Sequence, residues 1–307
     1  MPMVSYAQNG EDVVLRRVFA GSAPGFYVDI GANYPSEGSI TRHFYEHGWA
    51  GINIEPVAGA HRELQAARPR DVNLNVGISS APATARFFEA TNASMLSTFS
   101  AIEADAHQRL RGIVFVERVV EVMTLAEVCA RHVHGPIDFM SIDVENHERE
   151  VISGGDWQRW RPRVVVVEDF VDQAGLPTRN KWEPLLLAAD YHFGLFDGIN
   201  RFYVRGEDQP LLARLRAPAN AQDDYIHHRW FEQIQSLVEQ LAAAQAQAQQ
   251  AASEAAILRA GLSNGAEEMR LAHKWQNLAR QHPRLARLAR KTLQWFDRDA
   301  AALKKAG

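Results

Sequence analysis

Short apolar runs alternate with helical patterns over the first two-thirds of the chain, which is typical of parallel α/β units. The four valines at Val164–Val167 show no polar alternation, as in a central strand covered on both faces. The pattern predicts helices over Ser39–His47, Leu125–His132 and Glu148–Ser153. It predicts strands over Phe26–Ile30, Gly51–Ile54, Val72–Val76, Arg86–Phe88, Ile137–Ile142, Val164–Val167 and Arg201–Val204.

The pattern changes after Gly206, and this change divides the chain into three parts. Residues 1–205 form the predicted α/β domain. Residues 206–228 contain Pro210 and Pro218 and have the composition of a linker. Residues 229–307 form a predicted helical region.

The helical region begins with a heptad repeat of apolar residues, whose spacings alternate between four and three. The residues of this seam are Trp230, Ile234, Leu237, Leu241, Ala244, Ala248, Ala251, Ala255, Leu258 and Leu262. Because alanines make the middle of the seam thin, we expect a weak or antiparallel coiled coil, or packing against another helix, and a homo-oligomer. The alternative is a solvated low-complexity helix.

A basic amphipathic helix is predicted over residues 283–296. Leu285, Leu288, Trp295 and neighbouring apolar residues share one face, and four basic side chains lie mostly on the other. Such helices bind anionic membrane surfaces, so a peripheral membrane contact is one interpretation. Packing of the apolar stripe on the same domain or on a partner chain is the other.

Charge and composition narrow the class of protein. The 307 residues carry a net charge of −4, which does not indicate nucleic acid as a partner. The single cysteine, Cys129, fits a reducing compartment. The first ten residues are polar and uncharged, unlike a signal peptide, and no apolar run approaches the ~20 residues of a membrane span. We therefore expect a cytoplasmic protein.

Residues 25–33, with the sequence GFYVDIGAN, carry the strongest chemical signal. A buried strand ends at Asp29 and breaks into a turn at Gly31, where backbone N–H groups can approach a ligand closely. The next strand ends in Glu55, where doubly wound sheets place an acceptor for ribose hydroxyls. The glycine spacing is not G-x-G-x-x-G, so a dinucleotide is not the first expectation.

Carboxylates also follow two later strands. Asp143 comes directly after one, and Glu168 and Asp169 end another. If these strands are neighbours the three side chains converge, and a cation between them relieves their repulsion. Hard oxygen ligands suit Mg²⁺, which makes a bound hydroxyl more acidic. The alternative is that Glu168 and Asp169 are solvated, or pair with arginines such as Arg161 or Arg163.

Other polar residues are candidates for contacts with ligands. His147 lies beside the acidic residues and is preferred to His43 and His107 as a general base. Gln8 and Glu11 fit a lid that approaches a cofactor, although Glu11 also suits a helix first turn. Candidate acceptor contacts are Asn92 and Ser94 in a small polar loop, and Asn200 and Arg201 at a turn before the last strand.

These motifs together resemble the FkbM family of S-adenosylmethionine (SAM)-dependent methyltransferases. The resemblance covers about two-thirds of the chain, in one order. It is carried by SYAQNGED (5–12), VDIGAN (28–33), NIEP (53–56), NVGIS (75–79), SIDVE (141–145) with Glu148, and DGINRFY (197–203). Two positions depart from related patterns, because Asn146 stands where the family usually has Gly, and Glu168 stands where related magnesium enzymes commonly have Asp.

The resemblance implies a Rossmann-like class I methyltransferase fold, an α/β fold with a seven-stranded, mostly parallel sheet that ends in an antiparallel hairpin. The helical coiled-coil extension lies outside it. In such a fold Asp29, Gly31 and Asn33 would line the SAM site, and Glu55 would hold the ribose. Asn75 and Gly77 would lie near the adenine. Asp143, Glu168 and Asp169 resemble the metal triad of magnesium-dependent sugar O-methyltransferases.

The expected function is SAM-dependent methylation of a sugar hydroxyl in a glycan or glycolipid intermediate, with magnesium assistance. Asp143 with the metal, or His147 without it, would deprotonate the hydroxyl. One alternative is methylation of a small metabolite or a protein. Another is a scaffold that docks on a membrane glycan-assembly complex with weak or lost catalysis.

Overall fold

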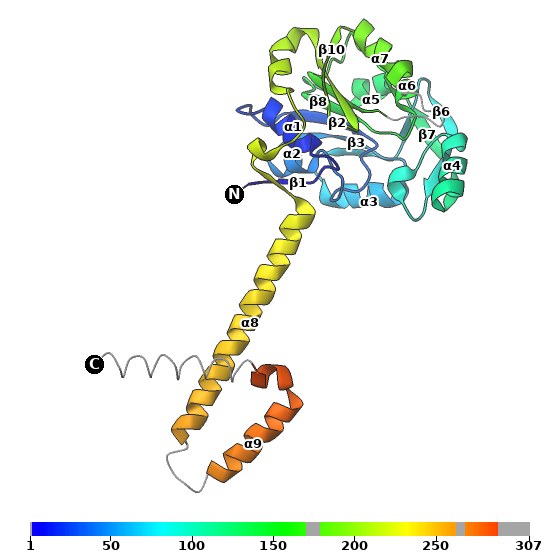
Figure 1. The fold of residues 1–307 in the computed structure, drawn as a ribbon. Helices are drawn as coiled ribbons and strands as arrows, with labels where there is room; N and C mark the ends of the chain where they lie inside the picture. Colours follow the sequence, from blue (N-terminus) through cyan, green and yellow to red (C-terminus); the bar gives the residue numbers. More distant parts are fainter. Residues whose placement is uncertain (1, 170–178, 262–267, 288–307) are drawn as a thin grey trace. The chain divides into compact units, whose positions relative to one another are not determined.

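The computed structural model describes residues 2–169, 179–261 and 268–287. The chain divides into two compact units, Met1–His228 and Arg229–Gly307. The first unit is built on strands flanked by helices, which confirms the predicted α/β class (Figure 1).

The main sheet of the first unit has seven strands in the order β10-β11-β9-β8-β2-β3-β4. Five of them run parallel, and β10 and β11 form an antiparallel hairpin beside β9. The strands are β2 (Phe26–Ile30), β3 (Ala50–Ile54), β4 (Val72–Leu74), β8 (Phe139–Ile142), β9 (Val164–Glu168), β10 (Tyr191–Phe196) and β11 (Asn200–Arg205). The chain starts at the centre, moves out to β4, and returns to β8 on the other side of β2.

Helices cover both faces of this sheet, and β9 shows why its sequence lacks alternation. Val165 and Val167 pack in one core with residues of α5 (Leu125–His132), α6 (Glu148–Ser153) and α7 (Arg179–Ala188). Val164 and Val166 pack in a second core with α1 (Glu11–Val18) and α2 (Arg42–Glu46). Because successive strand side chains point to opposite faces, a strand buried on both sides is apolar throughout.

A smaller sheet is inserted between β4 and α5. It consists of β5 (Gly77–Ile78), β7 (Phe115–Met123) and β6 (Ala83–Ala90), in that order. A short 3₁₀ helix, η1 (Ser94–Leu96), and α4 (Ala101–Arg111) connect β6 to β7. The sequence pattern predicted part of β6 but not β7 or α4. Helix α3 (Ala58–Ala67) contributes Ala60 to a third cluster that includes Phe87 of β6.

Residues 206–228 differ from the predicted linker, since they belong to the first unit. They form two 3₁₀ helices, η2 (Gly206–Arg214) and η3 (Ala221–Asp223), and β12 (Tyr225–His227), which pairs in parallel with β1 (Met3–Ser5). Leu215 is buried, and Asp223 forms an ion pair with Arg17 of α1 at 3.0 Å. Apolar side chains and an ion pair hold this proline-containing segment on the domain.

The second unit contains α8 (His228–Gly261) and α9 (Glu268–Gln281). The described part of the chain includes no helix whose length and hydropathy would let it cross a membrane. Most of the predicted basic helix, residues 288–296, lies outside the described residues.

Candidate active site

The site predicted from the sequence lies at the point where the strand order reverses. Strand β2 has β3 on one side and β8 on the other, and all three run parallel. Their carboxyl ends therefore lie at one edge of the sheet, where ligands of doubly wound folds bind. Asp29 lies near the end of β2, Glu55 follows β3, and Asp143 follows β8.

The glycine turn after β2 packs against the backbone of Asp143. Gly31 has a φ of +85°, and a Cβ atom there would lie 1.8 Å from the carbonyl oxygen of Asp143. The N–H groups of Gly31 and Ala32 both donate to the carbonyl of Ile54, at 3.0 and 3.1 Å. The sequence predicted a glycine that leaves room for a ligand, whereas in the structure the glycine leaves room for the neighbouring Asp143 segment.

Asp29 and Glu55 are buried beside this turn. Thr41 Oγ1 donates to Asp29 at 3.0 Å, and the N–H groups of Asn33 and Val57 donate to separate oxygens of Glu55 at 2.8 and 2.7 Å. Burial raises the pKa of both carboxyls to about 7. Two protonatable groups therefore lie at the ends of neighbouring strands.

Two further predicted cofactor residues lie near β3 and β5. The amide of Asn75 donates to the carbonyl of Glu55 at 2.8 Å. Gly77 packs so closely against Phe99 that a Cβ atom at position 77 would lie 2.3 Å from the Phe99 ring. The structure thus brings Asn75 to Glu55 and gives Gly77 a packing role.

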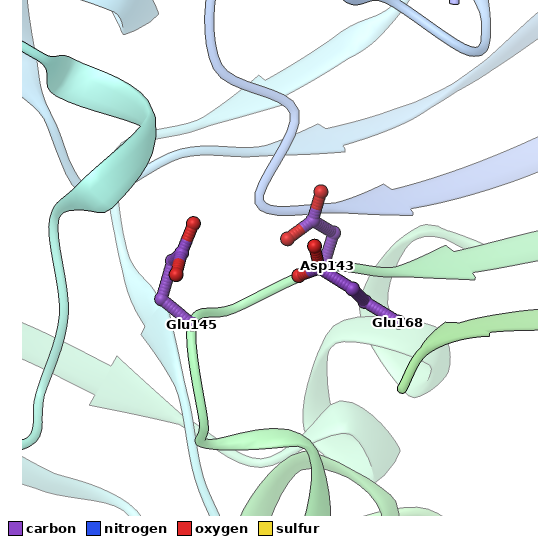
Figure 2. Close-up of side chains that lie close together, drawn as sticks. All are labelled: Asp143, Glu145 and Glu168. Carbon is purple, nitrogen blue, oxygen red and sulfur yellow. The ribbon is translucent and has the colours of Figure 1, made fainter. Parts of the chain in front are cut away.

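Three carboxylates converge between the ends of β8 and β9, as Figure 2 shows. One oxygen each of Asp143, Glu145 and Glu168 lies within 4.8 Å of the other two. Burial is the main reason that the pKa of each is raised, and Asp143 and Glu168 are joined by a side-chain hydrogen bond that requires a proton. Glu168 Oε2 is buried and has no hydrogen-bond partner among the described residues. Such a group can hold a proton or a hard divalent cation.

Asp169 lies apart from this group, although the sequence predicted it as a ligand. It pairs with Arg179 at 3.0 Å and lies 3.7 Å from Arg201. Because Asp169 follows Glu168 directly at the end of β9, the two side chains point to opposite faces. Glu145 takes the third place in the cluster. Arg161 and Arg163, the expected alternative partners, pair elsewhere, with Glu207 and with Asp138 and Asp208.

His147 is held by the inserted segment. Its Nε2 lies 3.1 Å from Ser79 Oγ, and its ring centroid lies 5.0 Å from that of Phe99. Burial lowers its pKa, which favours the neutral imidazole. The Nδ1 atom of His147 lies 3.9 Å from a carboxylate oxygen of Glu150, so its polar neighbours are Ser79 and Glu150 and not the three clustered carboxylates.

The N-terminal segment reaches the same edge of the sheet through Glu11. The amide of Asn200 donates to Glu11 at 2.6 Å, and Asn200 is paired with Glu168 in the register of β11 and β9. Burial raises the pKa of Glu11 to about 7. Gln8, which precedes this segment, is exposed. Glu11 and Asn200, predicted separately for cofactor and acceptor, therefore contact each other beside the carboxylates.

The other predicted acceptor residues, Ser94, Asn92 and Arg201, have three different surroundings. Ser94 donates to the side-chain oxygen of Asn33 at 3.1 Å, which joins η1 to the glycine turn. Asn92 is exposed and accepts from the N–H of Val114, within the inserted segment. Arg201 lies over the ring of Phe193 and donates to Tyr203.

Thr98 connects the inserted segment to the carboxylate cluster, which the sequence did not reveal. Its hydroxyl donates to the carbonyl of Glu145 at 2.8 Å and accepts from the N–H of Ser100 at 3.0 Å. Glu145 and Asn146 have φ values of +51° and +74°, a conformation that few side chains adopt readily. Asparagine tolerates it better than most, which accounts for Asn146 in place of the family's glycine.

We predict that Thr98→Val lowers the free energy of unfolding by about 1–3 kcal/mol, because the isosteric side chain leaves the partly buried carbonyl of Glu145 without its donor. Thr98→Ser keeps the hydroxyl and should cost less. Urea unfolding of both variants measures the difference. Equal stability of the Val and Ser variants would contradict this role for the hydroxyl.

The buried carboxyls make stability depend on pH. Glu11, Asp29 and Glu55 have pKa values raised to about 7, so the folded chain holds more protons than the unfolded chain between about pH 4.5 and 7. The free energy of unfolding should therefore be greatest near pH 5 and fall as the pH rises to 8. His43, whose pKa burial lowers to about 4, opposes this trend, as do His107, His147 and His227, whose pKa values burial also lowers.

Denaturant unfolding in EDTA at unit steps from pH 5 to 8 measures this dependence. Asp12 and Glu148, whose pKa values burial raises to about 6 and about 7, act in the same direction. A Glu55→Gln variant lacks one of these five carboxyls and should show a shallower decline. A stability that rises with pH in the unsubstituted chain would contradict the raised pKa values.

The structure is an α/β fold with carboxylates gathered at the switch point of its sheet, and comparison with known families identifies it as a methyltransferase domain. A profile of the methyltransferase FkbM domain matches residues 29–193, more than half of the chain. The chain belongs to the FkbM methyltransferase domain family, which confirms the resemblance seen in the motifs.

Among solved structures, methyltransferase FkbM from Methylobacillus flagellatus KT aligns with a TM-score of 0.38 and 13% sequence identity. The alignment covers 58% of this chain and 42% of that chain, so the present chain spans less than half of that protein. At this TM-score the alignment adds nothing to the family match. Among curated proteins, none matches this chain.

Proposed function

We propose that this chain transfers a methyl group from SAM to a hydroxyl oxygen of a sugar, in a glycan or glycolipid intermediate. Its family supports methyl transfer in general. The observation that carries the choice of a hydroxyl is the cluster of Asp143, Glu145 and Glu168 beside the glycine turn. A hydroxyl must lose its proton as it attacks a sulfonium methyl, and a carboxylate can accept that proton.

Asp29 and Glu55 would hold the cofactor. Each oxygen of Glu55 accepts one backbone N–H and keeps a second lone pair, so ribose hydroxyls can still donate to it. When bound, SAM supplies an electrophilic methyl group on a positively charged sulfur, which the surrounding carboxyls complement. Gln8, Glu11, Gly31, Asn33, Asn75 and Gly77 complete the proposed set of cofactor contacts.

Asp143, Glu145 and Glu168 would also hold Mg²⁺, with Glu145 in the place first predicted for Asp169. The unpartnered, buried Oε2 of Glu168 and the short separation of the three oxygens fit a cation with hard oxygen ligands. When bound, Mg²⁺ neutralises the cluster and makes a coordinated hydroxyl more acidic. Asp143 would accept the proton of the acceptor hydroxyl, and Ser94, Asn200 and Arg201 would help to position the acceptor.

Calorimetric titration with SAM, in Mg²⁺ and in EDTA, tests the cofactor and the metal separately. We expect micromolar binding of SAM that Glu55→Ala abolishes. Glu63→Gln, on the exposed face of α3, is the control and should bind normally. Heat of Mg²⁺ binding that Glu168→Gln removes would support the metal. Absence of SAM binding would overturn the proposal and favour the scaffold alternative.

A panel of acceptors then tests the substrate class. Labelled SAM is incubated with methyl glycosides, with small phenols and with peptides. Transfer to a glycoside hydroxyl supports the proposal. Transfer only to phenols or peptides would instead show that the chain methylates a small metabolite or a protein.

A further inference from the structure

Helix α8 exposes a continuous row of large apolar side chains. Among the described side chains of residues 229–259, none is buried. Trp230, Ile234, Leu237, Leu241 and Leu258 are 63, 49, 56, 59 and 42% exposed. They belong to one heptad seam, with spacings of four and three, which a straight helix exposes as a stripe along its length. A stripe of this kind is expected to be covered by a partner.

The seam suits a second helix of the same period. Large residues lie toward its two ends, and Ala244, Ala248, Ala251 and Ala255 occupy its middle. The helix has 34 residues and is therefore about 50 Å long. An identical helix in register places each large residue opposite itself and each alanine opposite an alanine, so every layer of the seam holds two side chains of equal size.

The charges beside the seam favour one orientation. The a positions of this heptad are Ile234, Leu241, Ala248 and Ala255. In a parallel pair, the residue before each a position faces the residue five places later on the other helix. This rule pairs Glu254 with Arg259 of the partner subunit, and the two-fold symmetry of the dimer gives two such pairs. Elsewhere along residues 230–259 the rule places no two like charges opposite each other. In the antiparallel pair that aligns the same seam, Glu254 faces Gln240 and Arg259 faces Phe231.

We propose that α8 pairs with α8 of a second copy of this chain, as a parallel, in-register, two-stranded coiled coil from Trp230 to Leu258. This replaces the weak or antiparallel association expected from the thin alanine seam. The proposal does not depend on the methyltransferase activity. It makes the protein a dimer.

Disulfide cross-linking of full-length protein tests the orientation. The one native cysteine, Cys129, is buried, so a single added cysteine gives an unambiguous product. Ala244→Cys and Ala251→Cys, both on the seam, should each form an interchain disulfide. Ala246→Cys, on the opposite face of the same helix, is the matched control and should stay largely unlinked.

An antiparallel pair can bring position 244 or position 251 to its own copy, but not both, so cross-linking of only one variant would overturn the proposal. Equal cross-linking of the Ala246→Cys control would do the same.

A charge exchange tests the pairing of Glu254 and Arg259. Glu254→Arg and Arg259→Glu should each weaken dimerisation, measured by sedimentation equilibrium, by roughly tenfold, because two attractive pairs become repulsive. The double variant restores both pairs and should recover the affinity of the unsubstituted chain. A monomeric unsubstituted chain, or a double variant no better than the single ones, would contradict the proposal. SAM binding should be the same in all four proteins.

Discussion

Replacing Asp143 with Asn should leave SAM binding within about threefold and slow methyl transfer by at least about 100-fold. Asparagine has nearly the same shape as aspartate and keeps an oxygen ligand, but it cannot take a proton from the acceptor. Its amide can also donate to Glu168, which preserves the hydrogen bond between the two side chains. The variant therefore removes the chemistry while it preserves the arrangement of the strand ends.

The matched control is Asp138→Asn, at the opposite end of the same strand. Asp138 accepts from the N–H of Phe26 at 2.9 Å and pairs with Arg163 at 3.2 Å, so its role is structural. This variant should lose stability and keep its rate at a permissive temperature. Calorimetry with SAM and single-turnover transfer to the best methyl glycoside measure both quantities. Normal turnover by Asp143→Asn would exclude Asp143 as the base.

The sequence predicted which acidic residues lie at the carboxyl edge of the main sheet, because an apolar run that ends in an acidic residue can be recognised locally. Asp29, Glu55 and Asp143 each follow an apolar run, and parallel strands bring such positions together. Among the predicted cofactor residues, Asn33 and Asn75 are hydrogen-bonded to Glu55. Asp29 lies near the end of the neighbouring strand β2. These contacts depend on the order of elements along the chain, which periodicity reveals.

The remaining contacts depend on the direction of individual side chains, which periodicity does not reveal. The strand over Val164–Val167 could be predicted, but not that Asp169, two residues further, turns to Arg179 and Arg201. Glu145 joins the cluster because the backbone at positions 145 and 146 is left-handed, held by Thr98 from an inserted segment 47 residues earlier. Asn146 is a local sign of the left-handed backbone, but neither it nor the distant hydroxyl shows from the sequence where the Glu145 side chain points.

The same argument explains residues 206–228. Pro210 and Pro218 are typical of a linker, but Leu215 is buried against the domain and β12 pairs with β1, more than 200 residues away in the sequence. Long-range pairing of this kind is invisible to composition, which is why the predicted boundary at 205 lies short of the boundary of the first compact unit at His228.

Replacing Gly31 with Ala should be among the most damaging single substitutions in the chain. Two penalties act together at this position. The φ of +85° costs an alanine about 1–2 kcal/mol, and its Cβ atom would lie 1.8 Å from the carbonyl oxygen of Asp143. That oxygen belongs to a backbone whose N–H donates to Ile30 of β2 at 3.0 Å, so it cannot move without separating β8 from β2.

Gly21 separates the two penalties. Its φ is +82°, almost the same as that of Gly31, but nothing lies within 4 Å of a Cβ atom there. Gly21→Ala should therefore lower the free energy of unfolding by only about 1–2 kcal/mol and leave SAM binding unchanged. Gly31→Ala should cost at least about 3 kcal/mol more and abolish SAM binding, because the clash displaces Asp143 and the glycine turn together. Denaturant unfolding and calorimetry measure both variants. If the two variants lost equal stability, the contact between Gly31 and Asp143 would not hold the switch point together, and the distance of Asp143 from the cofactor would have to be set by other residues.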